Sequence, residues 1–116
     1  MKEMIFGKGA NVLDTIAIER LLTASFDELS EHFGEIFKPA VVQGRVLYGE
    51  HGVMNSMHLV ALIAMLEEKI ADNFGMTVEL ATDDVMSSVS SPFRSFNSIV
   101  VHVLSVCRAF SPGDTL

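Results

Sequence analysis

The sequence predicts a small all-α protein, a bundle of three to four helices with an additional helical segment at its N-terminus. Two observations carry this prediction: apolar residues recur every three or four positions over several stretches, and helix start and stop signals separate those stretches. The chain has 116 residues, of which 49% are hydrophobic and 20% charged. This is enough for one buried core and too little for two typical domains.

The first helical region is expected over residues 11–37. Apolar residues between Asn11 and Ala24 follow an approximately helical spacing, and Ser25-Phe26-Asp27-Glu28 has the pattern of a capping box at a helix start. The helical spacing then continues to about Phe37, where Lys38 and Pro39 are typical of a helix end. Because a capping box can also lie inside a helix, the region is either one bent helix or two.

A loop and a long second helix follow. Residues 41–53 contain three glycines and no sustained helical period, so we expect a loop in which Val42, Leu47 and Tyr48 enter the core. The next helix is expected from near Ser56 to about Asn73, with Gly75 as a stop. Its buried stripe has steps of four, three, four and four residues and consists of Leu59, Ile63, Leu66, Ile70 and Phe74.

The C-terminal part is predicted to hold an extended link, one short helix and the last long helix. The link covers residues 76–80, and the short helix covers 83–88 with Thr82 or Asp83 as its cap. Ser95 is expected to cap the last helix. Its buried positions are Phe96, Ile99 or Val100, Val103 and Cys107.

Charge and cysteine content restrict the partners and the compartment. Eight basic and fifteen acidic residues give a net charge of −7, which disfavours nucleic acid as a ligand. Residues 27–84 hold eleven acids and three bases, a net of −8, which indicates either an ordinary solvated surface or a docking face for basic enzymes.

The longest apolar run has eight residues, too few to span a membrane. One cysteine and no signal-peptide pattern after Met1 favour a cytoplasmic location.

Ser56 is the candidate functional residue because it lies at the start of the second core helix. Free N–H groups and the positive end of the helix dipole meet there, which favours a phosphate ester on the hydroxyl. Serine is also one of the commonest helix caps, so a purely structural role is the alternative.

The surroundings of Ser56 resemble the acyl carrier protein family. The resemblance consists of a glycine-containing loop, Asn55-Ser56-Met57, a helix continuing into Leu66-Glu67-Glu68, and Phe74-Gly75. Residues 91–98, Ser-Pro-Phe-Arg-Ser-Phe-Asn-Ser, are similar to the segment that leads into the last helix of the family. The similarity covers about residues 25–106 in the family's order.

This resemblance implies an acyl-carrier-like bundle and a carrier protein, not an enzyme. Ser56 would receive a 4'-phosphopantetheine arm from coenzyme A, and the arm's thiol would hold acyl groups as thioesters for fatty acid, polyketide or related biosynthesis. The implied partners are a phosphopantetheinyl transferase, an acyl-loading ligase or acyltransferase, and downstream enzymes, with Met57, Glu67 and Glu68 as partner-binding residues. Residues 1–24 would be a partly helical extension packed on the bundle, 25–110 the carrier domain and 111–116 a tail.

The sequence also departs from the family pattern. Asn55 replaces the usual Asp, and His58 and Ala61 occupy positions that are frequently acidic in the family. These differences indicate a specialised carrier, or alternatively an unmodified helical adaptor whose acidic face binds a basic protein. Met54, Met57 and Met65 could adapt to an acyl chain or simply fill the core.

The other reactive side chains do not form a known catalytic or metal-binding pattern. The four histidines show no pairing four residues apart and no metal-binding motif; they are His32, His51, His58 and His102. Cys107 follows His102 by five residues, which places the two on different helix faces. Cys107 is therefore expected to be a small buried apolar residue.

Overall fold

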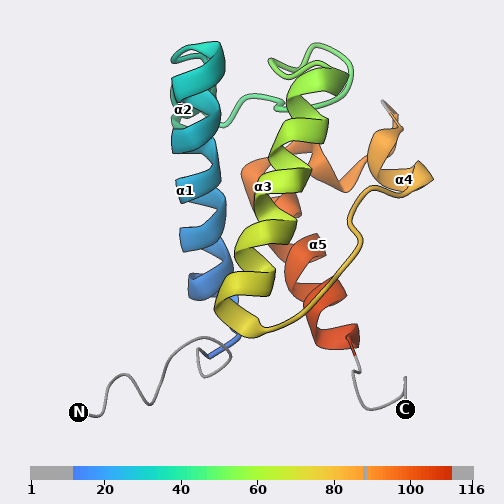
Figure 1. Cartoon of the computed structure of the whole chain (residues 1–116). Helices are drawn as coiled ribbons and strands as arrows, with labels where there is room; N and C mark the ends of the chain where they lie inside the picture. Colours follow the sequence, from blue (N-terminus) through green and yellow to red (C-terminus); the bar gives the residue numbers. More distant parts are fainter. Residues whose placement is uncertain (1–11, 88, 111–116) are drawn as a thin grey trace.

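The computed structural model describes residues 12–87 and 89–110, and within them it is an all-α bundle without a strand (Figure 1). Three long helices build the bundle: α1 (Thr15–Phe33), α3 (Ser56–Phe74) and α5 (Phe96–Ala109). Two short helices, α2 (Phe37–Val42) and α4 (Asp83–Met86), and a 3-10 turn, η2 (Pro92–Arg94), lie between them. The predicted fold class, a small all-α bundle, is confirmed.

Helix α1 is one continuous helix through the predicted capping box. The Asp14 carboxylate caps its start by accepting the Ala17 N–H at 2.9 Å. Ser25 is buried within the helix and donates its hydroxyl to the Leu21 carbonyl at 2.9 Å, which is how a mid-helix serine satisfies itself. The alternative of a capping box inside a helix is therefore the correct one, and the division after residue 24 does not coincide with a break in the chain's structure.

The predicted end of this region, at residues 37–39, is wrong. Helix α1 ends at Gly34, whose φ of 101° favours glycine and stops the helix. Helix α2 then begins at Phe37, and Pro39 lies in its first turn. A proline is tolerated there because the N–H groups of a first turn have no partner within the helix.

The region between α2 and α3 is a loop, as predicted, apart from the α2 residues at its start. Leu47 and Tyr48 are buried as expected, but Val42 at the end of α2 is 85% exposed, so the prediction for Val42 is wrong. The error arises because apolar character alone does not tell which face a short helix turns to the core.

The predicted boundaries of the later helices agree closely with the structure. Asn55 caps α3, and Gly75 ends it in the left-handed conformation at φ 68°. Thr82 caps α4 by accepting the Val85 N–H, and Ser95 caps α5 by accepting the Ser98 N–H at 3.1 Å. The helix predicted over 83–88 is shorter and ends at Met86.

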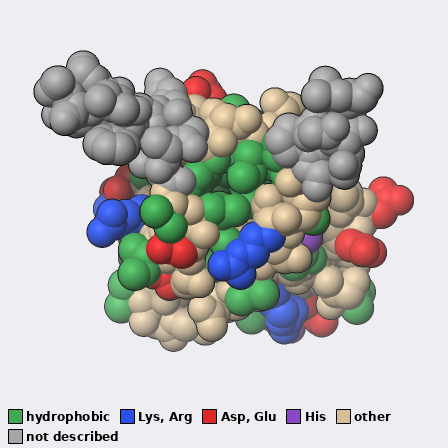
Figure 2. All heavy atoms as spheres, turned by 90° about the horizontal axis from the view of Figure 1, so that it is seen from below, with side chains coloured by type: hydrophobic (Ala, Val, Ile, Leu, Met, Phe, Trp, Pro, Cys, Tyr) green, Lys and Arg blue, Asp and Glu red, His purple; other side chains and the backbone are tan. Residues whose placement is uncertain are grey.

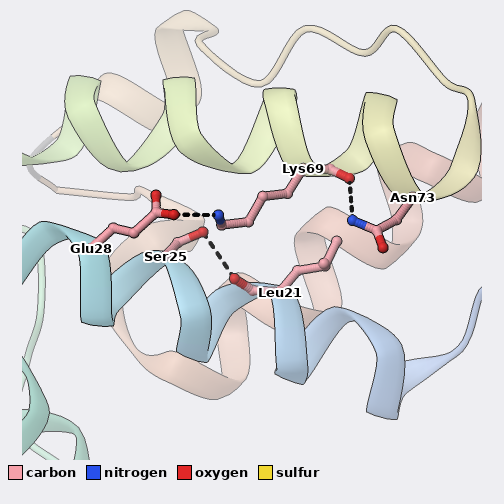
Figure 3. A network of polar contacts seen from close by, with 5 residues as sticks. All are labelled: Leu21, Ser25, Glu28, Lys69 and Asn73. Carbon is pink, nitrogen blue, oxygen red and sulfur yellow. Dashed lines mark hydrogen bonds and ion pairs between the residues drawn. The ribbon is translucent and has the colours of Figure 1, made fainter.

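Helix α1 packs against α3 and α5, and α1 and α3 run in opposite directions (Figure 1). A polar contact joins the two antiparallel helices at their exposed edge, where Lys69 Nζ lies 2.9 Å from Glu28 Oε2 (Figure 3). The predicted stripe of α3 is buried. The largest fully buried side chains come from all parts of the chain and include Phe26, Phe37, Phe93, Ile18, Leu22, Leu29, Leu47, Leu59, Leu62, Leu66, Ile70 and Leu80.

One end of the bundle, where α1 begins and α3 ends, presents apolar surface. Hydrophobic side chains gather at the middle of this face (Figure 2). A pocket of about 310 Å³ there is lined by residues of α1 and the end of α3, among them Ile16, Leu21 and Phe74. Helix α3 has 19 residues, so about 27 Å of helix separates this pocket from the end that carries Ser56.

Candidate functional site

Ser56 is the first residue of α3, and its side chain is exposed. The preceding residue, Asn55, is the helix cap, because its side-chain oxygen accepts the His58 N–H at 2.9 Å. The Ser56 hydroxyl itself makes no hydrogen bond to any described residue. The capping role, which was the structural alternative for Ser56, is therefore performed by Asn55.

The start of α3 offers free backbone donors next to Ser56. The N–H groups of Ser56 and Met57 have no acceptor among residues 12–87 and 89–110, as is usual for the first turn of a helix. The dipole of a helix places roughly half a positive charge at this end. No acidic side chain lies in the first turn of α3 to oppose an incoming anion. The position can accept a phosphate ester on electrostatic grounds.

His58 closes the first turn of α3 from its third position. The Asn55 N–H donates to His58 Nδ1 at 3.2 Å, which makes the two hydrogen bonds between these residues reciprocal. The His58 ring also meets the rings of Phe33 and Phe37 edge to face, with centroid distances of 4.7 and 5.1 Å. This role of His58 was not predicted, although a polar side chain three residues after the cap is its usual signal.

The loop before Asn55 is held against the rest of the bundle by backbone hydrogen bonds. The Met54 N–H donates to the Leu47 carbonyl at 2.7 Å, and the Leu47 N–H donates to the Arg94 carbonyl at 2.7 Å. Tyr48 adds a bond from its hydroxyl to the Met86 carbonyl at 2.8 Å. These contacts connect the start of α3 to the segment around η2 and to α4, so the position of Ser56 depends on both.

The exposed face of α3 next to Ser56 is apolar. Met57 is 63% exposed, Val60 is 53% exposed, and Ala64 one turn later is also exposed. The side chains of Glu68 and Asp72 face solvent farther along the helix. Residues 51–66 contain no Asp, Glu, Lys or Arg, so apolar surface separates Ser56 from the acidic part of the helix.

The three residues predicted to bind partners do not share one environment. Met57 and Glu68 are exposed on α3, as a partner contact requires. Glu67 is half-buried, and its carboxylate accepts the Leu80 N–H at 2.8 Å. Glu67 therefore ties α3 to the link before α4.

Of the three methionines near the site, two contribute to the interior. Met54 is buried, Met65 is half-buried, and Met57 is the exposed one. Leu59 and Ile63, on the inner side of the first turns of α3, are buried in the core. An apolar guest that entered beneath Ser56 would have to displace these side chains.

Helix α5 carries the two other reactive side chains. Cys107 is buried, and burial raises the pKa of its thiol. Burial lowers the pKa of His102, whose Nε2 is buried without a hydrogen bond.

Among the described residues, no three or more His, Cys, Asp or Glu side chains are grouped closely enough to hold a metal ion. No helix in this part of the chain has both the length and the apolarity needed to cross a membrane.

Comparison with known proteins gives no relative from which a function could be transferred. The chain matches no protein-family model, no curated protein and no solved structure.

Proposed function

We propose that this protein is an acyl carrier protein whose Ser56 carries a 4'-phosphopantetheine arm. The observation that carries the proposal is the position of Ser56, exposed at the first position of a 19-residue helix with its hydroxyl unbonded because Asn55 provides the cap. The resemblance of Asn55-Ser56-Met57 and Leu66-Glu67-Glu68 to the family motifs adds to it.

The surroundings of Ser56 fit the group. In the attachment reaction, the Ser56 oxygen forms a bond to the phosphorus of the pantetheine half of coenzyme A. The phosphoanhydride bond to the adenosine half breaks, and the hydroxyl proton leaves to a base of the transferase. The N–H groups of Ser56 and Met57 and the helix dipole favour the resulting phosphodiester. The arm's thiol supplies the thioester chemistry.

The face of α3 suits a partner that brings its active site to Ser56. Met57 and Val60 offer exposed apolar area beside the attachment point, and Glu68 offers negative charge about three turns away along α3. Within residues 27–84, Lys38 pairs with Asp27, and Lys69 pairs with Glu28. The remaining acids therefore make the electrostatic potential of this region negative. The partner enzymes are therefore expected to present an apolar patch with basic residues beside it.

The proposal is tested by intact-mass measurement after incubation with coenzyme A and a broad-specificity phosphopantetheinyl transferase. We expect the mass of one arm on the wild-type protein and no added mass on Ser56→Ala. Ser87→Ala, which removes a different partly exposed hydroxyl, is the matched control and should be modified like the wild type. An unmodified wild-type protein, or an arm that persists in Ser56→Ala, contradicts the proposal.

A second candidate function is an unmodified adaptor that binds a basic protein. The exposed Met57 and Val60 favour it, because apolar side chains on the solvent face of a helix are typical of protein interaction sites. The adaptor predicts partner binding that is lost in Met57→Asp and unchanged in Ser56→Ala. Loss of biological function in Ser56→Ala with full helicity would argue for the carrier instead.

A further inference from the structure

His58 and Asn55 form a capping box around Ser56 in which a histidine ring is the acceptor. The Asn55 N–H donates to His58 Nδ1 at 3.2 Å, and the His58 N–H donates to Asn55 Oδ1 at 2.9 Å. The usual partner at the third helical position is a glutamate or glutamine. An imidazole nitrogen can accept only when it carries no proton. The box therefore requires a neutral His58 ring with its hydrogen on Nε2.

Two phenylalanines hold the ring in the orientation that this hydrogen bond needs. Phe33 is the last residue of α1, and its ring lies 4.7 Å from the His58 ring at an interplanar angle of 74°. Phe37 is the first residue of α2, and its ring lies 5.1 Å away at 79°. Both contacts are edge to face, a favourable arrangement for aromatic pairs. They connect the corner between α1 and α2 to the first turn of α3.

We infer that His58 is a positioning residue for the modification of Ser56, an inference that rests on the proposed carrier function. Ser56 lies along the chain between the two members of the box, whose hydrogen bonds hold the N–H groups of Asn55 and His58 on either side of it. Neutral His58 keeps the first turn of α3 helical and leaves the Ser56 hydroxyl facing solvent. Protonation of Nδ1 turns the acceptor into a donor and opens the Asn55 end of the box.

Protonation also adds a positive charge near the N-terminus of α3, where the helix dipole opposes it. No described acid forms an ion pair with His58 that would offset this effect. Lys38 pairs with Asp27, and His51 lies 3.7 Å from Glu50. The titratable and charged groups on α1, on α2 and on the segments that connect them to α3 are Glu19, Arg20, Asp27, Glu28, Glu31, His32, Glu35, Lys38, Arg45, Tyr48, Glu50 and His51.

The first test measures the box itself by NMR, without any modifying enzyme. At pH 8 we expect His58 to carry its proton on Nε2 and the Asn55 amide to be protected from exchange. His58→Ala should lower that protection factor about fivefold, the equivalent of one lost cap bond. His58→Gln keeps a side-chain acceptor at the third helical position, so its Asn55 amide should remain protected. A proton on Nδ1 at pH 8, or the same Asn55 protection factor in His58→Ala as in the wild type, overturns the inference.

The second test measures kcat/KM for arm attachment with coenzyme A and a broad-specificity phosphopantetheinyl transferase. All rates are measured at pH 8. We expect His58→Ala to react about fivefold more slowly than the wild type, and His58→Gln, which keeps an acceptor, to react at close to the wild-type rate. The control His32→Gln, which removes an exposed histidine of α1, should follow the wild type.

The outcomes separate the two proposals. If the wild type accepts the arm and His58→Ala reacts at the wild-type rate, His58 does not position Ser56, and the carrier function stands. If the wild type accepts no arm, the carrier function and the role of His58 in it both fail.

Discussion

Among single residues, Gly52 has almost no space for a side chain. A Cβ atom there would lie 2.6 Å from the Leu47 carbonyl oxygen and 3.0 Å from the Tyr48 Cα, which are backbone atoms that cannot swing away. Gly52→Ala should therefore lower the free energy of unfolding by about 1–3 kcal/mol, the usual cost of overpacking. The measurement is urea unfolding followed by circular dichroism.

The control for Gly52→Ala is Glu50→Ala in the same loop. The Glu50 side chain is exposed, so its removal should change the free energy of unfolding by less than about 0.5 kcal/mol. Equal stability of Gly52→Ala and the wild type would show that the loop can move away from Leu47.

Asn55 and Ser56 show how adjacent residues divide two tasks. Either side chain is a plausible helix cap by residue type. The capping bond of Asn55 leaves the Ser56 hydroxyl exposed and without a partner among the described residues. Because the cap comes from a neutral amide, the site also lacks the negative charge that an aspartate would place beside a phosphate.

At the scale of elements, the link between α3 and α4 depends on one carboxylate. Glu67 accepts the Leu80 N–H at 2.8 Å, and Leu80 is fully buried. Glu67→Ala leaves that N–H without its acceptor and should lower the free energy of unfolding by about 1–3 kcal/mol. Glu67→Gln retains an amide oxygen as acceptor and should cost less. Chemical denaturation of the two variants provides the comparison.

Glu68→Ala is the matched control, because Glu68 is the neighbouring acid and is exposed. It should change stability by less than about 0.5 kcal/mol while weakening the binding of basic partners. A cost for Glu68→Ala as large as that for Glu67→Ala would contradict the role assigned to the Leu80 contact.

Helix α1 continues through a local helix-start pattern because tertiary packing outweighs that pattern. Ser25 and Glu28 have the spacing of a helix start, yet Phe26 and Leu29 are buried on the inner face of one uninterrupted helix. Ser25 donates to the Leu21 carbonyl, and Glu28 pairs with Lys69 of α3 (Figure 3). Both polar groups find partners within the folded bundle, so neither needs to cap a terminus.

At the scale of the whole molecule, two groups on α5 limit stability at opposite ends of the pH range. Burial lowers the pKa of His102 from about 6.5, so the unfolded chain takes up this proton more readily than the folded protein. The stability that the neutral ring contributes is present above pH 6.5 and is lost as the pH falls below that value. Urea midpoints measured between pH 8 and 5 should decrease, and His102→Gln should reduce the decrease.

Cys107 acts in the opposite direction. Burial raises the pKa of its thiol above 9.0, so the folded protein holds this proton more tightly than the unfolded chain. Its contribution is complete below pH 9.0 and is lost as the pH rises above it. Cys107→Ala should flatten the stability between pH 9 and 10.5 relative to the wild type. An equal decrease in both proteins would assign the alkaline loss to other groups.

Local sequence patterns were sufficient to predict the helical class, the three long helices and most of their ends. The buried stripe of α3, the glycine at its end and the caps of α4 and α5 are local features, because spacing along one helix and hydrogen bonds within one turn depend only on nearby residues. The position of Ser56 in the first turn of a helix was predictable for the same reason.

Features that depend on long-range contacts could not be predicted in this way and came from the packing of the helices. This packing turned Val42 outward, bound Glu67 to Leu80, and clamped His58 between two phenylalanines of α1 and α2. None of these follows from periodicity, since each depends on which surface another element presents at that point. The sequence of a helix determines which residues lie on its apolar face. Which residues of other elements that face contacts depends on how all the helices pack around the common core.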